Sequence, residues 1–156
     1  MFKTRHGLCI FVENEFGVIQ RITNLFSARG MSIDTIHTTT VSSSNKISQV
    51  SISLQESEKN IELMQKLLMR ILIVHEVQRV NIQEESSAYI SQVFTAKKES
   101  QKQVEDVLNQ YDLTPFVIEG SVQTYCITAT EKVLQASIKH LEVIPSVVLV
   151  KRYKVF

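Results

Sequence analysis

The chain has 156 residues, 44% of them apolar and 21% charged, with 17 Lys and Arg side chains against 16 Asp and Glu. This length predicts one domain or two small ones, and the apolar content is typical of a globular protein with a packed core. The balanced charge gives no indication of nucleic-acid binding, and the apolar runs are far shorter than the ~20 residues that span a bilayer. We therefore expect a cytoplasmic protein that binds neither nucleic acid nor membrane.

The spacing of apolar residues divides the first half of the chain into six elements. Residues 6–13 are typical of a strand, and residues 18–29 follow helical spacing up to Gly30, which suits the left-handed end of a helix. The β-branched residues 31–41 and the alternating residues 46–54 then predict a hairpin.

A helix and a strand complete this half. Ser57 is a candidate helix cap, and apolar residues follow it at helical spacing: Ile61, Met64, Leu68 and Ile71. Residues 77–83 then return as a strand, in which we expect Val80 and Ile82 to face the core. The polar residues 84–87 are the candidate linker to a second domain.

The second half of the chain repeats this order of elements. The expected elements are a strand at 89–96, a helix at 104–111, a hairpin of strands at 113–118 and 122–129, a helix at 134–141 and a last strand at 147–153. Each half is therefore βαββαβ, the order of the ferredoxin-like fold, in which helices cover one face of a four-stranded antiparallel sheet. We predict an α+β protein with two tandem ferredoxin-like domains, residues 1–84 and 85–156.

The sequence carries no recognisable catalytic or metal-binding motif. It contains no C-x-x-C, H-E-x-x-H, G-x-S-x-G or Walker sequence, and its four histidines are isolated. An RNA-binding sheet of this topology would present stacking aromatics, which residues 46–54 lack. We therefore predict no catalytic residue, no metal and no cofactor on this chain.

The most informative segment is the connection between the first strand and the first helix, residues 13–19. As a purely structural element it is a tight turn, since Asn14 tolerates turn conformations and Gly17 allows unusual backbone angles. The same residues can also bind a ligand. The unpaired amides near Gly17, Val18 and Ile19 can hold a carboxylate, and the side-chain oxygen of Asn14 can accept from an ammonium group. Spacing alone leaves both interpretations open.

The runs VENEFGVIQRI at 12–22, LFSARG at 25–30 and IDTI at 33–36 resemble the ACT domain of the regulatory (small) subunit of acetolactate synthase, also called acetohydroxyacid synthase. The resemblance covers the whole chain, because that family has an N-terminal ACT domain followed by a smaller βαββαβ domain. Residues 1–40 carry the specific match, whereas the second half matches mainly in pattern. The resemblance implies that residues 1–84 are an ACT domain that binds an effector.

What the resemblance implies is the regulation of a partner enzyme. Members of this family form homodimers through their ACT domains, bind valine between two subunits, and activate a large catalytic subunit while making it sensitive to feedback inhibition in branched-chain amino-acid biosynthesis. Thiamine diphosphate, Mg and FAD are then expected only on that catalytic partner, since this sequence has no Gly-Asp-Gly motif. By this resemblance the chain is a non-catalytic subunit.

The effector-binding positions of the family map onto six residues of this sequence: Asn14, Gly17, Val18, Ile19, Ser32 and Ile33. Asn14 and Gly17 match the asparagine and the glycine of the loop, and Val18 and Ile19 begin the helix and offer amides. Ile33 is an apolar neighbour that can bury a branched side chain. Ser32 stands where members usually have an asparagine that reaches the ligand from the neighbouring subunit. A serine is shorter and has one hydroxyl in place of an amide, which predicts weaker valine binding.

Two other functions are compatible with the same fold. One is a tandem-ACT amino-acid sensor that regulates a different enzyme or pathway. Copurification of the chain with a large thiamine-diphosphate enzyme would favour the acetolactate synthase regulatory subunit over this sensor. The other is a small phosphatase, which needs an Arg in the first strand-to-helix loop. This chain instead has Glu13 and Glu15 on either side of Asn14, and these carboxylates would repel a phosphate.

Residues 31–41 also predict how the chain assembles. The ferredoxin-like order places this strand at a sheet edge, and it has none of the Lys or Pro residues that protect a solitary edge. We expect it to pair with the same strand of a second copy, which gives a homodimer with a continuous eight-stranded sheet.

Overall fold

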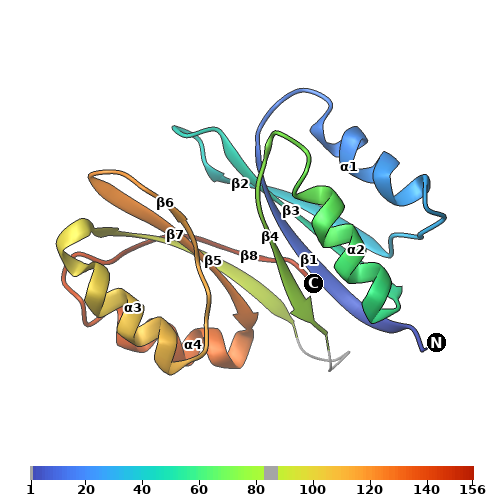
Figure 1. Ribbon diagram of the computed structural model, residues 1–156. Helices are drawn as coiled ribbons and strands as arrows, with labels where there is room; N and C mark the ends of the chain where they lie inside the picture. The colour runs from blue at the N-terminus through green and yellow to red at the C-terminus, as the bar shows by residue number, and fades with distance from the viewer. Residues whose placement is uncertain (1, 83–87) are drawn as a thin grey trace. The chain divides into compact units, whose positions relative to one another are not determined.

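The computed structural model describes residues 2–82 and 88–156 and divides into two compact units, the first ending and the second beginning within residues 83–87. Each unit is a four-stranded antiparallel sheet with two helices on one face (Figure 1). The predicted α+β class with two tandem ferredoxin-like domains is therefore confirmed. The predicted boundary between residues 84 and 85 and the predicted linker 84–87 lie outside the described residues.

The first unit contains six elements: β1 (Thr4–Glu13), α1 (Val18–Ser27), β2 (Thr35–Ser42), β3 (Ile47–Glu56), α2 (Glu58–Leu68) and β4 (Val74–Asn81). The strands lie in the order β2-β3-β1-β4, so β2 and β4 are the sheet edges. The core between this sheet and its helices includes three residues from each of the two central strands: Leu8, Ile10 and Val12 from β1, and Val50, Ile52 and Leu54 from β3. The predicted inward face of residues 46–54 is therefore correct.

Both predicted helix-end signals are also found. Gly30 adopts φ 66°, and the amide of Met31 donates to the carbonyl of Phe26 at 3.0 Å, which closes the end of α1 with a left-handed residue. The Ser57 side chain accepts the amide of Asn60 at 3.3 Å and caps α2. These local interactions set the helix boundaries that the apolar spacing alone leaves open.

Two strand predictions in this unit need correction. The strand predicted to begin at residue 31 begins at Thr35, because the amide of Met31 belongs to the helix end. The last strand begins at Val74, and Val77 rather than Val80 faces the helices. A bulge in the pairing with β1 lets Val74 and Val77 both face the core although they are three positions apart in the chain, while Val80 pairs with Gly7 on the other face.

The second unit contains β5 (Tyr89–Lys97), a 3-10 turn (Lys98–Ser100), α3 (Gln101–Gln110), β6 (Phe116–Ile118), β7 (Val122–Thr130), α4 (Glu131–Leu141) and β8 (Val148–Lys154). The strand order is β6-β7-β5-β8. The strand predicted at 113–118 is shorter than expected, since the amide of Leu113 donates to the carbonyl of Leu108 and closes the end of α3, and Pro115 has no amide for a ladder. No helix in the described ranges is long and apolar enough to cross a membrane.

Candidate functional site

The connection between β1 and α1 is a short, fixed turn that ends in a glycine. The amide of Asn14 donates to the carbonyl of Lys46 at 2.7 Å, and the amide of Glu15 donates to the carbonyl of Glu13 at 2.9 Å. Gly17 precedes α1 with φ 80° and ψ 6°, a left-handed conformation that costs a residue with a side chain roughly 1–2 kcal/mol. The left-handed backbone conformation therefore explains why this position favours glycine, as the sequence predicts.

The first turn of α1 has unused hydrogen-bond donors. The amide of Arg21 donates to the carbonyl of Gly17 at 3.1 Å and makes the first bond inside the helix. Across residues 2–82 and 88–156, the amides of Ile19 and Gln20 find no acceptor. These amides lie at the positive end of the helix dipole, so this helix start favours a negatively charged group.

Two other helices of the chain satisfy their first amides with a side chain. Ser57 accepts the amide of Asn60 at the start of α2, and Thr130 accepts the amide of Val133 at the start of α4. Both helices also have a glutamate in the first turn. Neither α1 nor α3 has a capping side chain or an acidic residue in its first turn, but a 3-10 turn leads into α3, whereas the left-handed Gly17 leads into α1.

The start of α1 borders a hollow of about 630 Å³ in the first unit. Residues of the loop, of α1 and of two strands line it: Asn14, Glu15, Phe16, Gly17, Val18, Ile19, Gln20, Thr23, Thr38, Ser48 and Val50. Four of the six predicted binding residues, Asn14, Gly17, Val18 and Ile19, are among them. The hollow is large enough for an amino acid.

The hollow combines three kinds of chemical group. Backbone amides of α1 are donors, as described above. The side chain of Asn14 is exposed and makes no hydrogen bond to any described residue, and the carboxylate of Glu15 is also exposed. Val18 and Val50 are buried and provide an apolar wall. A zwitterion with a small apolar side chain meets donors, acceptors and an apolar surface here.

Sequence reasoning missed the lining residues that come from elsewhere in the fold. Gln20 and Thr23 follow Gly17 at helical spacing of three, a signal that marks one helix face. Thr38 and Val50 are directly paired between β2 and β3, and Ser48 lies two residues before Val50. Only the strand register brings these three residues to the loop, and that register is not readable from residues 13–19.

The remaining two predicted binding residues, Ser32 and Ile33, do not line this hollow. Both lie in the connection that leads from α1 to β2, where Ser32 is exposed and Ile33 packs partly against the core. β1 and β2 both pair antiparallel with β3 and therefore run in the same direction. The residues before β2 consequently lie at the opposite end of the sheet from the loop that follows β1.

The family model described as the acetolactate synthase small subunit-like ACT domain matches residues 8–76, a range that contains every residue lining the hollow. The acetolactate synthase small subunit of Buchnera aphidicola subsp. Schizaphis graminum is 30% identical over 141 residues, which cover 86% of this chain and 85% of that protein. The chain belongs to the acetolactate synthase small-subunit family. The resemblance inferred from residues 12–36 is thus confirmed.

Solved structures with a similar arrangement include one small subunit. The acetolactate synthase small subunit of Thermotoga maritima is 19% identical, with 96% of this chain and 93% of that chain covered and a TM-score of 0.48. The regulatory subunit of aspartate kinase from Thermus thermophilus is 10% identical, with 92% and 94% covered and a TM-score of 0.43.

The second domain of this small-subunit family member treats the equivalent connection differently. Between β5 and α3, the amide of Lys97 donates to the hydroxyl of Ser146 at 3.2 Å, and that hydroxyl donates to the hydroxyl of Ser100 at 2.7 Å. A 3-10 turn occupies residues 98–100. The second domain therefore has a 3-10 turn and hydroxyl hydrogen bonds in this connection, although α3 also has no side-chain cap.

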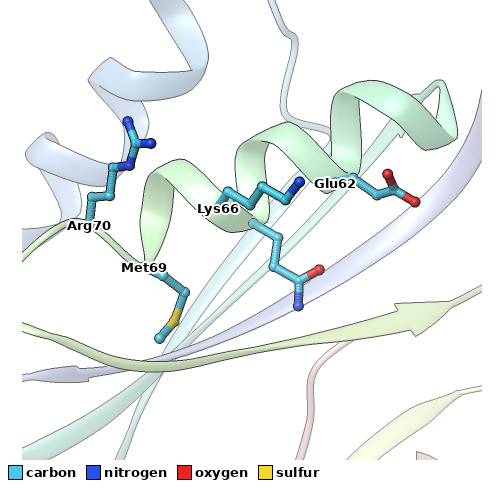
Figure 2. A pocket seen from close by; sticks show the side chains of 5 residues that line it. Glu62, Lys66, Met69 and Arg70 are labelled. Carbon is cyan, nitrogen blue, oxygen red and sulfur yellow. The ribbon is translucent and has the colours of Figure 1, made fainter.

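A second hollow of about 500 Å³ lies along α2 of the same family member (Figure 2). Its lining residues lie on α2 and in the turn that directly follows it: Glu62, Gln65, Lys66, Met69 and Arg70. The Gln65 side chain donates to the carbonyl of Val77, which ties the helix to β4. No predicted binding residue lies here, and the hollow has no wall of converging elements.

The ionisable side chains close to the loop form one ion pair. Glu13 Oε1 lies 3.6 Å from His75 Nε2, and both side chains are partly exposed. Nowhere in the described part of this small-subunit chain do three His, Cys, Asp or Glu side chains come together as a metal site.

Proposed function

We propose that this chain is the regulatory subunit of an acetolactate synthase: it binds the large catalytic subunit, activates it, and makes it sensitive to feedback inhibition by valine in branched-chain amino-acid biosynthesis. The chain itself is non-catalytic and works in the cytoplasm. Thiamine diphosphate, Mg and FAD belong to the catalytic partner. The observation that carries the proposal is the uncapped start of α1, which opens with Asn14 onto a hollow inside the range matched by the family model.

The hollow supports valine as the effector through the chemistry of its lining. The carboxylate of valine accepts from the unpaired amides of Ile19 and Gln20, and Gly17 lets it approach closely because it has no side chain. The ammonium group donates to the side-chain oxygen of Asn14, beside the carboxylate of Glu15. The isopropyl group packs on the apolar wall, and its burial contributes about 1.5–3 kcal/mol.

The proposed site is shared between two copies of the chain. β2 is an edge strand with a partly exposed Ile36 and no Lys or Pro. Antiparallel pairing of two β2 strands across a twofold axis brings the start of one strand to the end of the other. Ser32 and Ile33, which lie far from the hollow of their own chain, then reach the hollow of the partner.

The proposal is tested by mixing the purified chain with its cognate catalytic subunit and measuring acetolactate formation from pyruvate. We expect no turnover by the chain alone, faster turnover by the complex than by the catalytic subunit alone, and slower turnover of the complex when valine is added. An unchanged rate on mixing contradicts the proposal. Copurification with a different enzyme would instead favour the tandem-ACT sensor of another pathway.

A further inference from the structure

β8 is an edge strand with an unusual surface. It pairs with β5 on one side, and among the described residues no strand pairs with its other side. Three consecutive aliphatic residues are exposed: Val148 at 58%, Leu149 at 38% and Val150 at 52%. Contiguous exposed apolar residues on an unpaired edge are typical of a surface that receives another chain.

The charge on this strand has one sign. Lys151, Arg152 and Lys154 follow the aliphatic residues, and β8 contains no acidic residue. The β5 residues that pair with it, which lie between Ile90 and Thr95, carry no charge either. A partner strand laid along β8 therefore meets an apolar half and a positively charged half.

A bulge holds β8 in one conformation. Val93 pairs with Lys151 and Phe94 with Leu149, so Val150 is the extra residue. The buried side chain of Gln92 donates to the carbonyl of Lys151 at 2.9 Å and accepts from Nε of Arg152 at 3.2 Å. These bonds fix the strand before any partner arrives, which lowers the entropy cost of pairing.

We propose that β8 is a docking edge for an extended segment of the catalytic subunit that carries acidic and apolar side chains. The segment adds a strand to the second sheet: its backbone pairs with the outer side of β8, its apolar residues cover Val148 to Val150, and its carboxylates are attracted to the positively charged end of β8, where Lys154 is exposed. This inference rests on the proposed function, because it assigns a contact surface to the same partner.

A second copy of this chain is a poorer occupant of the same edge. Two paired β8 strands would place six Lys and Arg side chains in one short ladder, and like charges on neighbouring strands are destabilising. An acidic segment turns the same three positive charges into attraction. The charge of β8 therefore selects a different chain over a copy of itself.

The test compares two charge-reversed variants for binding to the cognate catalytic subunit. Lys154→Glu changes the docking edge, while Lys132→Glu makes the same change in net charge at an exposed position of α4. We expect the edge variant to raise the dissociation constant about tenfold or more and the control to change it less than about threefold. Val150→Thr, which keeps size and strand preference, should also weaken binding. Hydrogen exchange of residues 148–154 should slow when the complex forms.

The outcomes separate this inference from the proposed function. If the unmodified chain does not bind the catalytic subunit, both fail together. If it binds but both edge variants bind equally well and exchange at 148–154 is unchanged, only the docking edge is wrong, and the lysines merely protect the edge from self-association. Weaker binding by both edge variants, with normal thermal unfolding, supports the docking edge.

Discussion

The amide of Arg21 donates to the carbonyl of Gly17, and this 3.1 Å bond is where the hydrogen-bond ladder of α1 begins. Every amide before Arg21 in the first turn must find its partner outside the helix. In α2 and α4 a hydroxyl provides such a partner, whereas in α1 the turn faces a hollow. Four predictions on effector binding and assembly follow from this difference and from the edge strand β2, and a fifth concerns pH.

Replacing Gly17 with Ala should weaken valine binding beyond its effect on stability. Gly17 and Gly30 both adopt positive φ, and an added β-carbon meets no other atom within 4 Å at either position. Gly17→Ala and Gly30→Ala should therefore each lower the free energy of unfolding by about 1–2 kcal/mol. Only Gly17→Ala should weaken valine binding, as measured by isothermal titration calorimetry. Equal affinities in the two variants would contradict the proposed site.

Asn14→Ala should abolish the thermal stabilisation that valine gives. A ligand that binds only the folded protein raises the melting temperature as its concentration rises, and loss of the ammonium acceptor removes that binding. Asn24→Ala is the matched control, because Asn24 is an exposed asparagine of α1 that does not line the hollow. Thermal unfolding with increasing valine should show a shift in the control and none in Asn14→Ala.

Ser32→Asn should strengthen valine binding by supplying the side-chain amide that the family resemblance implies at this position. One added charge-assisted hydrogen bond is worth roughly 1.5–3 kcal/mol, so the dissociation constant should fall at least about tenfold. The gain depends on the partner chain, so it should vanish at concentrations where the chain is monomeric. No valine-induced shift in either the parent or Ser32→Asn would mean that the loop is only a structural turn.

Ile36→Lys should prevent formation of the proposed homodimer. Ile36 is a partly exposed residue of the edge strand β2, and a lysine there protects the edge by placing like charges across the twofold axis. Val122→Lys adds the same charge at an exposed position of β7 in the second domain. Sedimentation velocity at micromolar concentration should give a monomer for Ile36→Lys and a dimer for the control and the parent.

Glu56 should make stability depend on pH. Its carboxylate accepts the amide of Ser57 at 2.8 Å and lies 3.7 Å from Lys3, and the backbone bond holds the pKa of Glu56 below its ordinary value. The unfolded chain then takes up this proton at a higher pH, so the stabilisation is present above the ordinary pKa of about 4.3 and is lost as pH falls through the folded-state pKa.

The measurement for this residue is urea unfolding between about pH 7 and pH 3, a range that spans the glutamate pKa. Glu56→Gln should be less stable than the parent at pH 7 and should lose less stability on acidification. Glu62→Gln, at an exposed position of α2, is the control and should follow the parent. A parallel pH dependence in the parent and Glu56→Gln would rule out the contribution of this carboxylate.

The sequence predicts the fold well where one face of an element is buried and its ends carry local signals. In β3 apolar and polar residues alternate from Gln49 to Gln55, and Ser57 caps α2, which begins at Glu58, so periodicity and capping agree. The prediction fails where backbone geometry interrupts the pattern. The bulge between β1 and β4 changes which valines of β4 face the core, and no residue pattern marks it.

The candidate site was predictable in its local part only. Asn14, Gly17, Val18 and Ile19 are neighbours in the chain, and the loop and helix start hold them together whatever the rest of the fold does. Thr38 and Val50 join them through the pairing of β2 with β3, which depends on the whole sheet. Ser32 and Ile33 do not line the hollow of their own chain, and only in the proposed dimer would a second copy bring them to it.

The bond between Ser146 and Ser100 also has a quantitative consequence. In the second domain a 3-10 turn leads into α3 and these hydroxyls hydrogen-bond within the connection, whereas in the first domain Gly17 leads into α1 beside the hollow described above. A saturating titration should therefore end at one molar equivalent of effector per chain. Two symmetric sites in a dimer are also the smallest number that allows one occupied site to alter the affinity of the other.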